Sequence, residues 1–389
     1  MSTRVLALAA LTCAALVARA AEPQPPAKIA NASASAPRAA GAQSFRIGNS
    51  GPSTGANSAT MLELLAGARL YFDAVNAEGG IKGRKVQLIQ MDDNFEVGRT
   101  VSNVEKLIGE KRVDALLLVR GTPHNEAILP LIERAGVPLI APSTGAMVLH
   151  QPVKPLVFNV RTAYRTEAQK LAAVLASTGR KRVAIVHVAD SFGEDVAQGL
   201  LAGLAERKLT AVTVQKFDRK AMDIERTAAE VKRADADTIV LVGAGQAVVA
   251  GIQALRALDV KVPIATLSNN ASSGFVKALG DHARGIMVTQ VFPDERLGSM
   301  PLTRDAAELA RKANVALTPA MMEGFAAAKV TVDALRRCAG ACSRADLVRS
   351  LDTLDLDLGG MKVAYSPTNH TGLEFTDLSI IDRNGAFRR

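Results

Sequence analysis

Short loops rich in glycine and hydroxyl side chains follow several apolar runs of this chain. Three such loops lie at residues 49–55, 120–122 and 142–145. Backbone N–H groups and hydroxyls in loops of this kind suit an anion such as a carboxylate, although the same residue types also serve simple turn chemistry. The candidate binding residues in these loops are Ser53, Gly121, Thr122, Ser143, Thr144 and Gly145.

Motifs for nucleotide chemistry or metal catalysis are weak or absent. The sequence contains no GxxxxGK[ST] phosphate loop, and Gly243-Ala244-Gly245 lacks the third glycine of a dinucleotide fingerprint because Val248 takes its place. The five histidines are scattered without the spacing of metal ligands. We therefore expect no catalytic residue, no metal, no cofactor and no enzymatic activity.

Segments typical of strands and helices alternate along the chain. Apolar residues recur at helical spacing between Met61 and Val75, whereas the continuous apolar run 113–119 is typical of a buried strand. This alternation predicts βαβ units in an α/β fold with parallel sheets. The loops described above then lie at the carboxyl ends of strands, where open α/β sheets bind their ligands.

The same alternation restarts after Val160, so we expect two similar lobes. Residues 301–351 read as helices with little strand, and we expect them to return to the first lobe. Chain crossings near residues 162, 291 and 365 would then form a hinge. The predicted first ligand-binding lobe comprises residues 45–162 and 292–365, and the predicted second lobe comprises residues 163–291 and 366–389.

The first 20 residues have the order of a cleavable export signal. Arg4 precedes an apolar stretch at 5–17, and Ala18-Arg19-Ala20 offers a cleavage site. We predict a signal peptide at 1–20, followed at 21–44 by a flexible leader dominated by alanine, proline and serine.

Two cysteines, Cys338 and Cys342, remain after the predicted signal peptide. In an exported protein such a pair predicts a structural disulfide, although its oxidation state stays open. The spacing does not match a redox CxxC motif, and two thiols without a nearby histidine are weak metal ligands.

The composition is that of an ordinary globular protein of about two domains. Of the 389 residues, 48% are hydrophobic and 22% are charged, and the formal net charge is +9. The basic residues are spread thinly and do not form a run with interleaved aromatic residues, so we expect no nucleic-acid partner.

Six ordered segments resemble the periplasmic ligand-binding proteins of the branched-chain amino-acid transport type. They are FRIGNSGPSTG, GARLYFDAVNAEGGIKGRKVQLIQMDD, GVPLIAPSTGA, FNVRTAY, VAIVHVADSFGED and GIMVT. The resemblance covers residues 45–389. It implies a type I periplasmic binding fold, in which two Rossmann-like lobes are joined by three hinge crossovers. It also implies a periplasmic location, a small ligand in the cleft, closure by hinge motion, and an ABC permease in the inner membrane as partner.

The resemblance also suggests roles for individual residues. Gly121, Thr122 and residues 143–145 fall at loops with which the family holds an amino acid. Phe192 stands where the family commonly has an aromatic residue that covers the ligand. Further residues expected at the cleft are Tyr164, Gln246, Ser268 and Asn269. Tyr164 has an equally good alternative role in packing the hinge.

The chain departs from the best-known members at the group that pairs with the ligand's ammonium. Where those members carry an acid, this chain has Ser268, Asn269 and Asn270, which supply no charge. Asp190 offers a substitute, although an aspartate at that place is commonly a helix cap. Arg120 and Arg161, at the ends of predicted strands, instead suit an aliphatic or aromatic carboxylate. The ligand class is therefore an amino acid or a related small carboxylate.

These observations predict a periplasmic solute-binding protein that captures a small ligand and delivers it to an ABC permease. The alternative is an exported binding protein that senses its ligand without taking part in uptake. Both interpretations predict the same cleft, so the sequence does not separate them.

Overall fold

The computed structural model describes residues 44–219 and 223–389. The predicted signal peptide lies outside the described residues, as does the predicted leader except for Ser44. Within the described ranges, no helix combines the length and apolar character needed to cross a bilayer.

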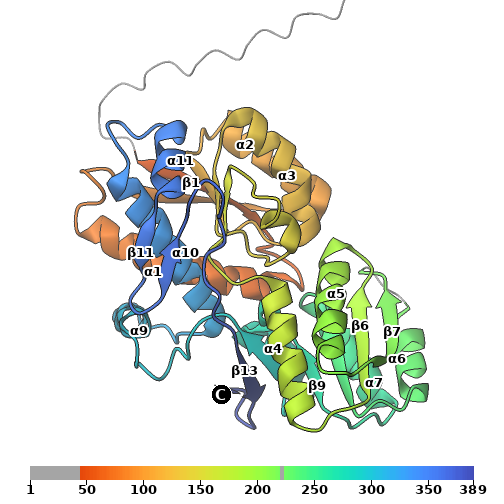
Figure 1. Ribbon diagram of the computed structural model, residues 1–389. Coiled ribbons are helices and arrows are strands. Elements are labelled where there is room, and N and C mark those ends of the chain that lie inside the picture. Colours follow the sequence, from red (N-terminus) through yellow and green to blue (C-terminus); the bar gives the residue numbers. More distant parts are fainter. Residues whose placement is uncertain (1–43, 220–222) are drawn as a thin grey trace, which may run out of the picture. The chain divides into compact units, whose positions relative to one another are not determined.

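The first sheet, of which β1 is labelled in Figure 1, has five parallel strands in the order β2-β1-β3-β4-β5. The strands are β1 (Phe45–Gly51), β2 (Val86–Asp92), β3 (Ala115–Leu117), β4 (Leu139–Ile140) and β5 (Val157–Phe158). The helices between them are α1 (Ser58–Ala77), α2 (Val97–Gly109), α3 (Thr122–Ala135) and the short 3₁₀ helix η1 (Met147–Leu149).

Alternating side chains of this sheet pack against helices on both of its faces. Leu117 belongs to a buried cluster with Met61 of α1, whereas its neighbour Leu116 belongs to a separate cluster with Val104 of α2 and Ile128 of α3. Successive residues of a strand point to opposite faces, so a continuous apolar run is required here.

The second sheet has seven strands in the order β14-β13-β10-β9-β8-β6-β7. They are β6 (Val183–Val188), β7 (Ala211–Phe217), β8 (Thr238–Val242), β9 (Ile264–Thr266), β10 (Met287–Gln290), β13 (Asp377–Ile381) and β14 (Phe387–Arg388). Its helices are α4 (Tyr164–Ser177), α5 (Ser191–Ala205), α6 (Ile224–Arg233), α7 (Gln246–Ala257), η2 (Ser268–Asn270), α8 (Ser273–Leu279) and η3 (Gly280–His282). The predicted α/β fold with largely parallel sheets is confirmed, and the antiparallel pairing of β13 with β10 and β14 is an addition to it.

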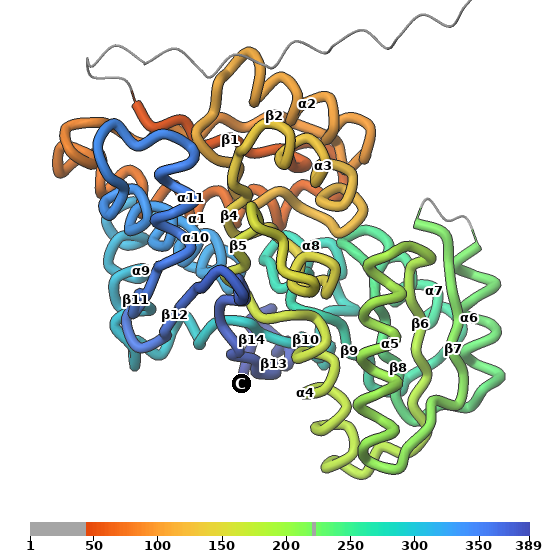
Figure 2. Tube along the Cα trace, turned by 45° about the horizontal axis from the view of Figure 1, so that its top comes forward, coloured from red at the N-terminus to blue at the C-terminus, as the bar shows by residue number. Residues whose placement is uncertain are grey.

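Segments distant in sequence complete both sets of elements. The remaining elements are α9 (Pro301–Lys312), α10 (Pro319–Arg337), α11 (Arg344–Asp352), β11 (Asp355–Asp357) and β12 (Lys362–Ala364). Helix α10 packs along α1, whereas β13 pairs with β10 and β14 pairs with β13 (Figure 2). We call the elements around the first sheet, with α9–α11, β11 and β12, lobe A, and those around the second sheet lobe B. The chain crosses between them at 159–163, 291–300 and 365–376.

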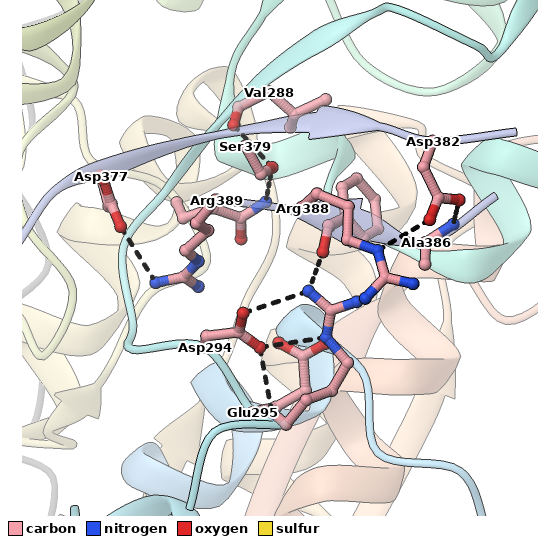
Figure 3. A network of polar contacts seen from close by, with 12 residues as sticks. Val288, Asp294, Glu295, Asp377, Ser379, Asp382, Ala386, Arg388 and Arg389 are labelled. Carbon is pink, nitrogen blue, oxygen red and sulfur yellow. Dashed lines mark hydrogen bonds and ion pairs between the residues drawn. The ribbon is translucent and has the colours of Figure 1, made fainter. Parts of the chain in front are cut away.

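Charged residues hold the C-terminal strands to the second of these crossings (Figure 3). Arg296 pairs with Asp294 at 3.1 Å and also donates to the backbone carbonyl of Phe387. The Ser379 hydroxyl donates to the carbonyl of Val288 at 3.0 Å, which ties β13 to β10. The chain end is thus anchored in lobe B by side chains as well as by the sheet.

A disulfide links Cys338 and Cys342 directly after α10, with 5.4 Å between their Cα atoms. Arg84 donates to the carbonyl of Ala341 at 2.9 Å inside the small loop that the disulfide closes. The disulfide therefore lies in lobe A, next to the turn that precedes β2.

Candidate ligand-binding site

A pocket opens between the two lobes, with about 270 Å³ of space not filled by atoms when the open solvent at its mouth is included. Its walls come from both: the lobe A residues are Phe95, Arg120, Gly121, Thr122 and Ser143, and the lobe B residues are Tyr164, Phe192, Arg219, Ala244 and Asn269.

The topology of the sheets brings these residues together. Eight of them lie in segments that directly follow β2, β3, β4, β7, β8 or β9, at the carboxyl ends of parallel strands. The remaining two are Tyr164, the first residue of α4, and Phe192, the second residue of α5. The α3, α4 and α5 helices therefore all begin at the pocket, where their unpaired N–H groups favour negative charge.

Gly121 adopts a backbone conformation that other residues rarely accept. Its φ angle is 95°, and a Cβ atom at this position would lie 2.5 Å from Nδ1 of His124. Glycine is therefore required for the sharp turn from β3 into α3. Because glycine has no side chain, the backbone of this loop faces the pocket directly.

Aromatic rings form the apolar part of the walls. The rings of Tyr164 and Phe192 lie 4.9 Å apart, and Phe95 stacks on His124 at 4.6 Å. The Arg219 guanidinium lies over the Phe95 ring at 4.8 Å. A ligand in this pocket would contact aromatic carbon as well as polar groups.

Arg120 is a buried cation without a carboxylate partner of its own. Its side chain is 3% exposed, its Nη2 donates to the backbone carbonyl of Asn269 at 3.0 Å, and its Nη1 has no hydrogen-bond partner. Burial lowers the pKa of Arg120, and Tyr164 and Glu323 offset this effect only in part. An anion bound in the pocket would supply the missing partner.

Arg161, by contrast, forms ion pairs with carboxylates of the protein itself, although its Nη1, like that of Arg120, has no hydrogen-bond partner. Its Nη2 pairs with Glu167 and donates to the Ser268 hydroxyl at 2.7 Å, and its Nη1 lies 3.7 Å from Glu323. Burial alone would lower the pKa of Arg161, but Glu323 and Glu167 raise it above its usual range. Because Glu323 belongs to α10 of lobe A and Glu167 to α4 of lobe B, this network lies at the junction of the lobes.

The other charged group at the pocket is also paired. Arg219 forms an ion pair with Asp190, whose carboxylate accepts from the backbone N–H of Gly193 at 3.1 Å and so caps α5. Asp190, the suggested substitute for the missing acid, is therefore committed to Arg219 and to the helix cap.

Several residues predicted from the sequence line the pocket, namely Gly121, Thr122, Ser143, Tyr164, Phe192 and Asn269. Thr144 lies directly behind them, with its hydroxyl 2.7 Å from that of Thr122. Gly145 also lies behind the wall, where a Cβ atom would come within 2.7 Å of the Thr162 carbonyl oxygen. Gly145 therefore permits close packing of its loop on the first crossing.

Three further predicted residues do not line this pocket. Ser268 holds Arg161, and the backbone N–H of Gln246 donates to Asn57 of lobe A at 3.3 Å. The backbone N–H of Ser53 donates to Asp92 at 2.7 Å. Ser53 lies within GPSTG, which matches the GxSxG pattern of hydrolases, but α1 begins only at Ser58 and no histidine bonds to Ser53. The structure therefore gives this serine no base.

Phe95, Arg219 and Ala244 line the pocket but were not predicted. Each follows a strand of one of the two sheets, so a systematic reading of every strand end would have found them. Ala244 lies in the segment whose glycines resemble a partial dinucleotide fingerprint.

The chemistry available here is recognition of a ligand. The described lining residues include no carboxylate, histidine or cysteine, and the described part of the chain contains no group of three or more potential metal ligands of these types. Guanidinium, hydroxyl and amide groups beside aromatic rings are suited to holding a small organic anion.

Comparison with known proteins agrees with this arrangement. The sequence pattern of the family described as periplasmic binding protein matches residues 44–378. A substrate-binding periplasmic protein from Ralstonia solanacearum has a similar structure, with 27% sequence identity and a TM-score of 0.81, covering 88% of this chain and 99% of that one.

Two curated relatives are more distant in sequence. An amino acid binding protein from Pseudomonas aeruginosa is 26% identical over 200 residues, which is 50% of this chain and 52% of that protein. A Leu/Ile/Val-binding protein from Escherichia coli is 24% identical over 229 residues, which is 58% of this chain and 61% of that protein. The chain thus spans about half to three fifths of the length of these two relatives.

Proposed function

The chain belongs to the periplasmic binding protein family, and from this premise we propose that it captures a small carboxylate between its lobes in the periplasm and delivers it to an ABC permease. Members of this family are substrate-binding proteins rather than enzymes. The names of the two curated relatives make amino acids the first ligands to test beside carboxylates that lack an amine.

The observation that carries this proposal is the environment of Arg120. A guanidinium that is 3% exposed, with Nη1 unpartnered, lies in the wall of a pocket whose described lining contains no carboxylate. Such a group keeps its desolvation cost until an anion binds. A ligand carboxylate there would also lie against Thr122, Ser143 and the first turn of α3.

Binding between the lobes would also stabilise the contact between them. Arg120 of lobe A already donates to Asn269 of lobe B, and the Ser191 hydroxyl of lobe B donates to Glu126 of lobe A at 2.6 Å. A ligand that contacts both walls favours this closed arrangement over an open one, which is how a binding protein of two lobes signals occupancy to its partner.

The test is isothermal titration of the exported protein with amino acids and with amine-free carboxylates. We expect at least one carboxylate to bind, and the Arg120→Met variant to bind it at least 100-fold more weakly. Arg233→Met, an exposed arginine of α6, is the matched control and should bind like the wild type. Carboxylate binding that survives Arg120→Met would contradict this site.

Delivery to a permease requires a separate experiment. Uptake of the labelled ligand should fall in cells from which the gene is deleted and should return with the wild-type gene but not with Arg120→Met. Unchanged uptake after deletion, with tight binding in vitro, would favour the sensing alternative.

A further inference from the structure

Two unpartnered polar atoms of opposite character lie on residues that line the pocket. Nη1 of Arg120 is a buried donor without an acceptor, and Oδ1 of Asn269 is a buried acceptor without a donor. We propose that the pocket is selective for a 2-hydroxy acid, whose carboxylate binds Arg120 and whose neutral hydroxyl donates to Asn269. This inference rests on the proposed function, since it specifies the ligand of the same pocket.

The orientation of the Asn269 amide is set by the protein. Its Nδ2 donates to the carbonyl of Gly243 at 2.9 Å, so the other side of the amide presents the oxygen. The oxygen accepts only, and the group that satisfies it must therefore be a donor. A ligand that is only a carboxylate leaves Oδ1 unpaired.

The two atoms also indicate how close the ligand's polar groups must be. Arg120 donates through Nη2 to the backbone carbonyl of Asn269 at 3.0 Å, so the unpartnered Nη1 and Oδ1 belong to two residues in direct contact. A carboxylate and a hydrogen-bond donor on the adjacent carbon are close enough to bind these two atoms together, whereas groups at opposite ends of a long molecule are too far apart.

A hydroxyl suits the Asn269 position better than an ammonium group. Arg120 and Arg219 line the pocket, and three helices begin at it, so the surroundings favour negative charge. Two carboxylates near the pocket already have partners: Glu323 interacts with Arg161, Arg120 and Ser143, and Asp190 pairs with Arg219. An ammonium would face a neutral amide oxygen beside two guanidinium groups, without a counter-ion of its own.

The rest of the ligand is expected to be apolar. Phe95, Tyr164 and Phe192 supply aromatic surface in the wall of the pocket, which suits an apolar group of the ligand. The proposed ligand is therefore a 2-hydroxy acid whose side chain is an aromatic ring or a branched aliphatic group.

The experiment compares three molecules with one carbon skeleton: 3-phenyllactate, phenylalanine and 3-phenylpropionate, which carry a hydroxyl, an ammonium and a hydrogen on the same carbon. The aliphatic set is 2-hydroxyisocaproate, leucine and 4-methylpentanoate. Each is titrated calorimetrically into the wild-type protein, with both enantiomers of the chiral compounds. We expect the hydroxy acid of at least one set to bind at least tenfold more tightly than its two analogues.

A variant of Asn269 tests whether this residue binds the hydroxyl group of the ligand. Asn269→Ala keeps the backbone carbonyl that Arg120 contacts but removes Oδ1, so the hydroxy acid should lose its tenfold advantage over the deoxy acid. Asn384→Ala, an exposed asparagine near the chain end, is the control and should retain the advantage.

The outcomes separate this inference from the proposed function. Tighter binding of the amino acid, or equal binding of hydroxy and deoxy acids, overturns the hydroxy-acid inference but leaves carboxylate capture intact. Retention of the hydroxyl preference in Asn269→Ala overturns the role of Asn269. No binding of any of the six compounds to folded protein contradicts the hydroxy-acid inference, whereas the proposed function is contradicted only if the wider panel of amino acids and carboxylates also fails to bind.

Discussion

Two arginines at equivalent places in the first sheet have opposite environments. Arg120 is the third residue after β3, and Arg161 is the third residue after β5. Both side chains are buried, with 3% and 1% exposure. Arg161 has two glutamates from different lobes as partners, whereas Arg120 has a single backbone carbonyl.

This difference separates a structural role from a ligand-binding one. The network around Arg161 compensates the charge within the protein and joins the two lobes through Glu167 and Glu323. Arg120 has no carboxylate partner in the protein. The free-energy cost of burying its charge therefore favours the binding of an anion in the pocket. The predictions below test this contrast.

The largest expected effect is on stability and follows from removing Arg161. Arg161→Ala leaves Glu167 and Glu323 as buried carboxylates without their cation, and we expect a loss of about 3–5 kcal/mol in the free energy of unfolding. Urea denaturation measures it, with Arg233→Ala as an exposed control expected to change stability by less than about 0.5 kcal/mol. A loss below about 1 kcal/mol for Arg161→Ala would remove the contrast.

Arg120→Met should show the reverse pattern. The ligand affinity should fall by about 2–5 kcal/mol, because the ligand carboxylate loses its buried cation. The free energy of unfolding of the ligand-free protein should stay within about 1 kcal/mol of the wild type or rise, since an uncompensated charge is removed. A large loss of stability would show that Arg120 is also structural.

Acid should weaken the fold through histidines near these two sites. Burial lowers the pKa of His150 to about 4, with a further contribution from Arg161, and burial also lowers the pKa of His124 to about 4. The unfolded chain takes up these protons below pH 6.5 and the folded chain only near pH 4. Stability is therefore full above pH 6.5 and falls as the pH drops towards 4, by about 3 kcal/mol for each histidine.

His150→Gln tests how much of this loss of stability in acid is due to His150. Its denaturation midpoint should fall less than that of the wild type between pH 7 and pH 4.5, while the contribution of His124 remains. Parallel curves for the two proteins would show that His150 does not take part.

The smallest effect is expected behind the pocket wall. The hydroxyls of Thr122 and Thr144 lie 2.7 Å apart and are both buried. Thr122→Val removes this hydrogen bond, while Thr144 keeps its hydrogen bond with Tyr164, and the change should cost about 1 kcal/mol of stability. Carboxylate affinity should also fall by about tenfold, or about 1.4 kcal/mol. The double change Thr122→Val with Thr144→Val should destabilise by less than the sum of the single changes, and a simple sum would contradict their pairing.

The sequence by itself predicted the α/β architecture and the glycine and hydroxyl residues in the lobe A wall of the pocket. The run 113–119 had to be a buried strand because its side chains pack on both faces of the sheet, as Leu116 and Leu117 do. Gly121, Thr122 and Ser143 follow such strands, so their position at the pocket follows from local pattern and the parallel topology. The resemblance to a family was needed for Phe192 and Asn269.

Only the tertiary structure decided which arginine is available to a ligand. Arg120 and Arg161 both follow predicted strands, so the sequence does not distinguish them. Their partners do, and one of these is Glu323 of α10, which is distant from Arg161 in the sequence. The free oxygen of Asn269 likewise follows from the amide's bond to Gly243. Local sequence determines backbone conformation and the periodicity of burial, whereas the compensation of a buried charge depends on contacts between distant segments and is visible only in the folded chain.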